Sequence, residues 1–139
     1  EDVDVLGVSL LSGVQMTGGL TDVEALPGDT ITVSLTAKVD GRSCPTCRYR
    51  ILVGWSDRAT PSRCIYNGKP LGAIKTITRT FDLVVPANPI GLSRPLDRCI
   101  AGKAARSGST TCNQSSWPGG SPNATPETSF LSHVKVTAF

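Results

Sequence analysis

The stretch ITVSLTAKV, residues 31 to 39, is apolar at every odd position and polar at every even position. This period of two is typical of a β-strand that buries one of its faces. Pro27-Gly28 precedes the stretch and Asp40-Gly41 follows it, and both dipeptides are turn signals. The chain is therefore predicted to be built from strands that turn one face toward a common core.

Further strands are predicted along the rest of the chain. Between residues 47 and 55 the apolar side chains of Tyr49, Ile51, Val53 and Trp55 share a face. A short strand ends at Asn67-Gly68, a long one covers residues 74–85, a weak one covers 96–100, and the last covers 130–139. About seven to eight short strands at this spacing predict an all-β protein, an immunoglobulin-like two-sheet sandwich that forms a single domain over residues 1–139.

The N-terminal segment does not keep one clean apolar face. Val3 and Val5 stand at odd positions, whereas Leu6, Val8 and Leu10 stand at even ones. Either a bulge at Gly7 switches the register, or the strand is buried on both sides. The second pattern fits a strand inserted into a neighbouring subunit. Residues 1–13 are accordingly a candidate exchanged strand, with these five apolar residues as candidate subunit contacts.

Residues 107–129 are mostly Ser, Thr, Gly, Pro and Asn, which predicts a long loop. Asn113-Gln114-Ser115 and Asn123-Ala124-Thr125 match the acceptor pattern for N-glycosylation, so Asn113 and Asn123 are candidate glycan sites. Trp117 lies in this polar loop and is a candidate ligand contact, whereas Trp55 is expected in the core. Long ordered loops of this kind often carry function.

Five cysteines indicate an oxidising compartment. Cys44-Pro45-Thr46-Cys47 has redox-motif spacing, but a redox reading requires a helix N-terminus in a βαβ setting. Zinc would need a second ligand pair nearby. Structural disulfides are favoured, although their connectivity is open. Cys47 and Cys64 flank a hairpin and could face each other, and Cys99 and Cys112 could tie the next loop, which would leave Cys44 unassigned.

The charge pattern and the residue inventory favour no catalytic or nucleic-acid-binding role. The net charge is only +3, and the basic residues lack the interleaved aromatics that stack on bases. The carboxylate pairs Asp2/Asp4 and Asp22/Glu24 fit solvated strand edges. His133 is the only histidine, and no catalytic or metal-binding constellation is recognisable. We therefore expect no enzyme activity, no cofactor and no metal, and, because no long apolar run occurs, no membrane span.

Three segments carry a resemblance to a known family: VDVLGVSL at 3–10, LPGDTITV at 26–33 and FDLVVP at 81–86. They resemble the bacterial adhesion-related immunoglobulin-like domains called CARDB, with a first strand, a Pro-Gly-Asp turn into the second, and a late strand that ends in proline. The resemblance implies an extracellular adhesive or architectural module without catalysis of its own. In outline only, the layout also resembles pilus-type subunits that donate a terminal strand.

These observations predict a secreted or cell-surface protein that assembles with copies of itself into a surface layer or fibre. The chain begins at Glu1 without methionine, which we interpret as a mature N-terminus left by signal-peptide removal or as a truncated chain. Glycans are possible additional partners. The alternative is a carbohydrate-binding module of a secreted enzyme, which would need several exposed, coplanar aromatic side chains.

Overall fold

A computed structural model describes residues 3–11, 14–15, 22–55, 63–87, 96–107 and 129–136 of the chain. These residues contain nine strands and no helix. The described residues therefore include no helix that is long and apolar enough to cross a bilayer. The strands are β1 (Val3–Leu10), β2 (Val14–Gln15), β3 (Asp22–Ala25), β4 (Thr30–Asp40), β5 (Arg48–Trp55), β6 (Arg63–Gly68), β7 (Ile74–Val84), β8 (Leu96–Ser107) and β9 (Ser129–Val136).

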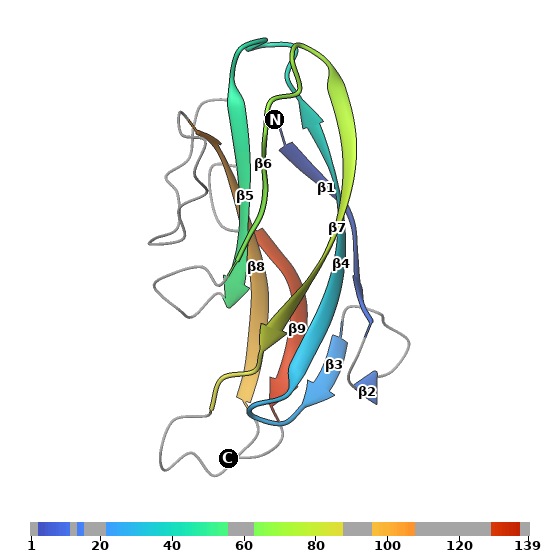
Figure 1. The fold of residues 1–139 in the computed structure, drawn as a ribbon. Coiled ribbons are helices and arrows are strands. Elements are labelled where there is room, and N and C mark those ends of the chain that lie inside the picture. Colours follow the sequence, from blue (N-terminus) through green and yellow to red (C-terminus); the bar gives the residue numbers. More distant parts are fainter. Residues whose placement is uncertain are drawn as a thin grey trace.

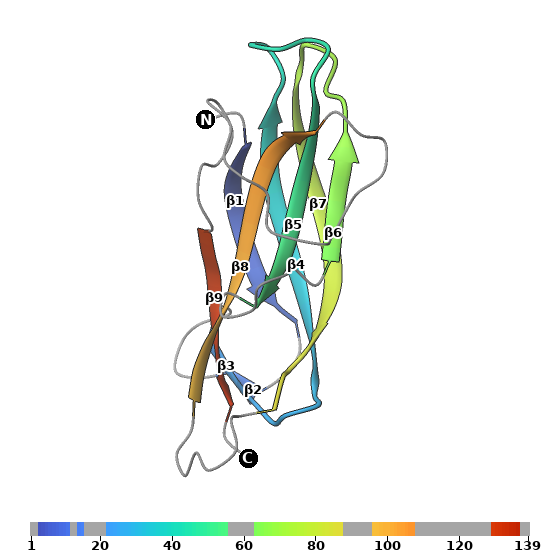
Figure 2. The same cartoon turned by 90° about the vertical axis from the view of Figure 1, so that its left-hand side faces the viewer.

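The strands form two sheets that pack face to face in an elongated sandwich (Figures 1 and 2). One sheet has the order β1-β4-β7, and the other has the order β2-β3-β9-β8-β5-β6. Neighbours are antiparallel except β3 and β9, which run parallel. The chain passes from one sheet to the other between β1 and β2, β3 and β4, β4 and β5, β6 and β7, and β7 and β8. The predicted immunoglobulin-like sandwich is confirmed.

The core lies between the sheets and is built from the alternating positions that the sequence indicates. β4 pairs with β7 along its whole length, from Thr30 opposite Val84 to Asp40 opposite Ile74. The five odd-numbered side chains of β4 are buried, and the even-numbered ones face away from the core. They meet the inner face of β5, whose buried side chains include Tyr49 and Trp55. A period of two therefore places the core residues correctly.

The six-stranded sheet is covered on both faces along β5 and β8, which the sequence pattern did not predict. Leu52, Ala101 and Ala105 are buried, although they lie outside the central core cluster. β8 is also longer than the weak strand predicted for residues 96–100, because it continues to Ser107. Its small side chains and a register shift between Ile100 and Ala101 hide the alternation by which a strand is recognised.

Strands β2 and β3 were not predicted either. They have two and four residues, which is too short for a periodic pattern to emerge. β3 pairs in parallel with β9, with Asp22 opposite His133, so these residues of distant segments adjoin in one sheet. Of the predicted 107–129 loop, residues 108–128 lie outside the described part of the chain.

Candidate interaction sites on the sandwich

Strand β1 is the first strand described, and it lies at the edge of the three-stranded sheet, where β4 is its sheet neighbour. The pairing runs from Val3 opposite Val39 to Leu10 opposite Val33, with a register shift between Val5 and Gly7. Leu6 is the extra residue of this bulge. The bulge alternative of the sequence analysis is therefore confirmed, and in the single chain the strand is not buried on both sides.

The bulge divides the five candidate subunit contacts into two groups. Val3 and Leu10 are 3% and 1% exposed and belong to the core, and Val8 packs partly against it. Val5 and Leu6 are 44% and 58% exposed, so they face solvent in the single chain. β1 thus has anchors near both ends and an exposed apolar segment between them.

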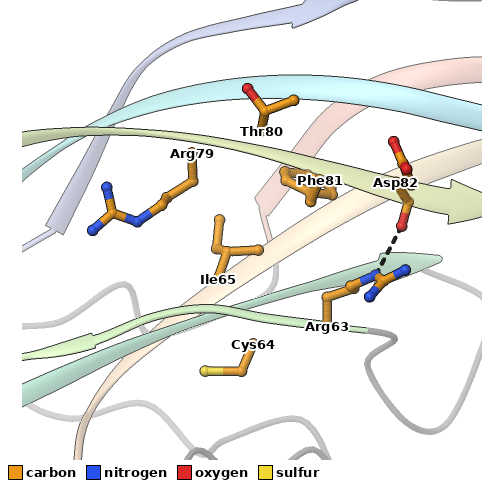
Figure 3. Close-up of a pocket in the computed structure, with 7 residues that line it drawn as sticks. All are labelled: Arg63, Cys64, Ile65, Arg79, Thr80, Phe81 and Asp82. Carbon is orange, nitrogen blue, oxygen red and sulfur yellow. Dashed lines mark hydrogen bonds between the residues drawn. The ribbon is translucent and has the colours of Figure 1, made fainter.

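An open groove of about 430 Å³ runs between β6 and β7, each of which is the last strand of its sheet. Ile65 and Phe81 lie at its centre, and the side chains of Arg63 and Arg79 lie toward opposite ends (Figure 3). Arg63 Nε donates a 2.9 Å hydrogen bond to the main-chain oxygen of Asp82. One arginine therefore bridges the two sheets across the groove.

The charged groups of the groove are already engaged within the protein. The Asp82 carboxylate accepts a 2.8 Å hydrogen bond from the Thr32 hydroxyl. The Arg79 guanidinium lies 5.6 Å from the centre of the Tyr66 ring and donates to the main-chain oxygen of Thr78 at 3.0 Å. Partial burial raises the pKa of Tyr66, and the nearby arginine charges oppose that rise. The groove therefore offers an apolar surface at Ile65 and Phe81, with a guanidinium group toward each end.

The groove was not predicted from the sequence. The groove forms where the edges of two sheets approach each other, and strand periodicity contains no information about that distance. Trp55, which the sequence predicts in the core, is buried there at 3% exposure. Its Nε1 donates a 2.9 Å hydrogen bond to the main-chain oxygen of Val84, so it is a second bridge between the sheets.

The cysteine pairing offered from the sequence is wrong at Cys47. The structure has a disulfide between Cys44 and Cys47, whose Cα atoms are 5.3 Å apart. Cys64 is disulfide-bonded as well, and its partner is not Cys47. Cys99 is a half-buried thiol, which also overturns the suggested link to Cys112. The Cys44–Cys47 bridge lies in the connection between β4 and β5, where Cys47 N donates a 3.0 Å hydrogen bond to Cys44 O and brings the ends of the motif together.

The same connection holds an ion pair that shifts the titration of a carboxyl group. Arg42 donates to Asp40 through Nε at 3.0 Å, through a terminal nitrogen at 2.8 Å and through its main-chain N–H at 3.0 Å. These hydrogen bonds, with the guanidinium charge, lower the pKa of Asp40 from 3.8 to about 2. The stabilisation is fully present above pH 3.8 and is lost as the pH falls through about 2.

We therefore expect the Asp40 carboxyl of the folded protein to titrate with a midpoint near 2. Replacing Arg42 with Gln removes the guanidinium and should return the Asp40 midpoint toward its ordinary value. Carboxyl carbon NMR of a pH series measures both. An unchanged Asp40 midpoint in Arg42→Gln would contradict the assigned cause, and Lys38→Gln is the control, because Lys38 is the weakest contributor to the shift.

The remaining predicted site residues fall into two groups. Asn113, Asn123, Trp117, Cys112 and Asp2 lie outside the described residues. His133 lies in β9, opposite Cys99 and Asp22. Within the described segments, no three His, Cys, Asp or Glu side chains come together in a way that could hold a metal ion.

Comparison of the chain with protein-family models and with curated proteins finds no match. The resemblance to CARDB domains therefore stays a prediction that rests on the three quoted segments. A function for the chain has to be inferred from its fold and from the geometry of the candidate sites.

Proposed function

We propose that this protein is an extracellular, non-enzymatic structural or adhesive protein that assembles with copies of itself by exchanging strand β1. The observation that carries the proposal is the position of β1. It is an edge strand near the N-terminus, and among the described strands its only sheet neighbour is β4. A copy of β1 from a second molecule would make the same hydrogen bonds and bury the same Val3 and Leu10 side chains. Exchange of an identical element is a low-cost route to assembly.

The connection after β1 favours exchange. Only residues 11–13 separate Leu10 from Val14 of β2, and β2 pairs with β3 of the opposite sheet. Short hinge segments favour domain swapping, because a strand that would have to fold back tightly can instead extend into a neighbour. The side chains of Val5, Leu6 and Leu11 supply exposed apolar surface near this edge, and assembled copies would cover it.

The cysteines support the extracellular part of the proposal. Cys44 and Cys47 form one disulfide, and Cys64 takes part in another. Disulfides persist in oxidising environments and are rare in the cytosol. The two glycosylation sequons at Asn113 and Asn123 fit the same location.

Cross-linking between two singly substituted proteins tests the exchange. Ser9 and Ser34 face each other across the β1–β4 ladder, and facing residues of an antiparallel pair lie within disulfide range. Neither Ser9→Cys nor Ser34→Cys can form this bond within one molecule. In a mixture of the two, we expect a disulfide-linked heterodimer, because the β1 of one molecule lies on the β4 of the other.

The control mixture pairs Ser9→Cys with Thr80→Cys, whose new thiol is exposed on β7 and away from β1. It should give only background cross-linking, which also accounts for any reaction of Cys99. The heterodimer yield should rise with protein concentration, in step with the oligomer fraction seen by light scattering. Equal yields in the two mixtures, or a protein that stays monomeric at every concentration, would refute exchange.

A further inference from the structure

The end of the sandwich opposite the β3–β4 turn presents a leucine in an unfavourable backbone conformation. Leu71 has a φ of 56° and Gly72 a φ of 75°, and Ala73 N donates to Pro70 O at 3.2 Å. Two positive φ values across this hydrogen bond are the signs of a type I′ turn, which favours Asn-Gly at the central positions. A leucine there costs stability, and yet its side chain is 71% exposed. Leu71 therefore has no evident role in the stability of the fold.

The neighbouring loop holds this turn in place. Gly41 N donates to Ala73 O at 2.9 Å, which joins the β4–β5 connection to the turn. A Cβ on Gly41 would collide with the Pro70 ring, so the two backbones approach as closely as glycine allows. Gly72 lies against Pro45, which is inside the Cys44–Cys47 disulfide loop. Figures 1 and 2 show both loops together at the far end of the long axis.

Apolar and basic side chains are exposed together at this end, which we call the Leu71 tip. Its exposed apolar residues are Pro45, Leu71, Ala73 and Ile74. Its exposed basic residues are Arg42, Lys69 and Lys75. Arg42 is neutralised by Asp40, whereas no ion pair found among the described residues involves either lysine. The tip thus combines exposed apolar side chains with a net positive charge.

We propose that the Leu71 tip docks on the surface of a lipid bilayer that carries anionic headgroups. The tip is a projecting turn and not a concave pocket, and a bilayer accepts a projecting apolar side chain without a matching cavity. Leu71 and Ile74 would enter the interfacial layer while Lys69 and Lys75 contact the headgroups, as in other interfacial anchors. β1 begins near the tip, with Val3 opposite Val39, but no residue of the tip belongs to β1. This proposal therefore stands or falls independently of strand exchange.

Co-sedimentation with vesicles tests the proposal, at a protein concentration at which the chain is monomeric. We expect binding to phosphatidylcholine vesicles that contain phosphatidylglycerol, and little binding to phosphatidylcholine alone. Binding should weaken with added salt. Lys69→Gln/Lys75→Gln should lower the partition coefficient roughly thirty-fold, which is the contribution of about two cations near an anionic surface.

Leu71→Asn separates a docking role from a structural one. Asparagine suits the turn better than leucine, so this variant should unfold at a higher urea concentration than the wild type. Its vesicle binding should fall about ten-fold or more, because the apolar side chain is gone. The matched control is Leu26→Asn, which removes a leucine with 50% exposure at the opposite end. It should leave vesicle binding unchanged.

Several results would overturn the proposal. Equal vesicle binding by Leu71→Asn and the wild type would show that Leu71 does not contact the bilayer. A lower urea midpoint for Leu71→Asn than for the wild type would show that Leu71 supports the fold. Equal binding to neutral and anionic vesicles would show that the headgroup charge does not contribute to binding. Absence of vesicle binding together with binding to a soluble acidic protein would assign the tip to a protein partner.

Discussion

Replacing Trp55 with alanine is expected to lower the free energy of unfolding by about 3–5 kcal/mol. Trp55 is almost fully buried between the sheets, so the substitution leaves a large cavity. It also removes the 2.9 Å hydrogen bond from Nε1 to the Val84 oxygen on the opposite sheet. The loss of packing and of the bridge act in the same direction. Urea unfolding followed by circular dichroism measures the change.

Trp55→Phe separates the two contributions. It keeps most of the apolar contact but leaves the Val84 oxygen without its donor, and the cost should be about 1–3 kcal/mol. Arg63→Gln is the matched control on the other bridge. Arg63 is exposed, so solvent replaces its hydrogen bond and the change should stay below about 1 kcal/mol. A loss below about 1 kcal/mol in Trp55→Ala would show that the sheets do not depend on this contact.

The two bridges also limit how the β7 edge can be used. Trp55 and Arg63 occupy the main-chain oxygens of Val84 and Asp82, which point away from β4. A strand from another molecule could not pair with this half of β7 without displacing both donors. Native sheets protect their edges by covering them in this way. Exchange is proposed at the other end of this sheet, where β1 is the terminal strand and a copy of it can take its place on β4.

The strands that were predicted well are those with one buried face. In β4 the apolar residues alternate along the whole strand, and in β7 Ile77, Phe81 and Leu83 share one face, which is the face that is buried. β8 was predicted too short because both of its faces are covered and its small side chains give no alternation. β2 and β3 have too few residues for an alternation of apolar and polar side chains to be recognised. The pairing of β3 is decided by contacts between segments more than one hundred residues apart.

The candidate sites were harder to predict, because they depend on how elements meet. The ambiguity of β1 is visible in the sequence, because the change of parity between Val5 and Leu6 is local. The same change is compatible with a bulge and with a doubly buried strand, so the sequence leaves both open. To predict the groove and the Leu71 tip, one would need the distances between loops and between sheet edges, which the sequence pattern does not contain. The Cys44–Cys47 bridge depends on the turn geometry of one loop, and spacing alone leaves the pairing open.

Removal of residues 1–10 is expected to destabilise the protein strongly, and a peptide added separately should reverse the effect. The truncated chain loses the buried side chains of Val3 and Leu10 and leaves one edge of β4 unpaired. Burial of these two side chains alone contributes about 3–6 kcal/mol. A synthetic peptide of residues 3–11 can supply the same contacts from outside. Thermal unfolding of the truncated chain should therefore shift upward as the peptide concentration rises.

Two peptide variants show whether the added strand occupies the native register. Leu10→Ala removes a core anchor that is 1% exposed, whereas Leu6→Ala changes a bulge residue that is 58% exposed. The first should bind at least ten-fold more weakly than the native peptide, because a buried leucine is lost, and the second should bind almost normally. Equal loss in both would place the peptide elsewhere on the sandwich. If the truncated chain is as stable as the full-length protein, β1 is dispensable, and a neighbour's strand would gain nothing by taking its place.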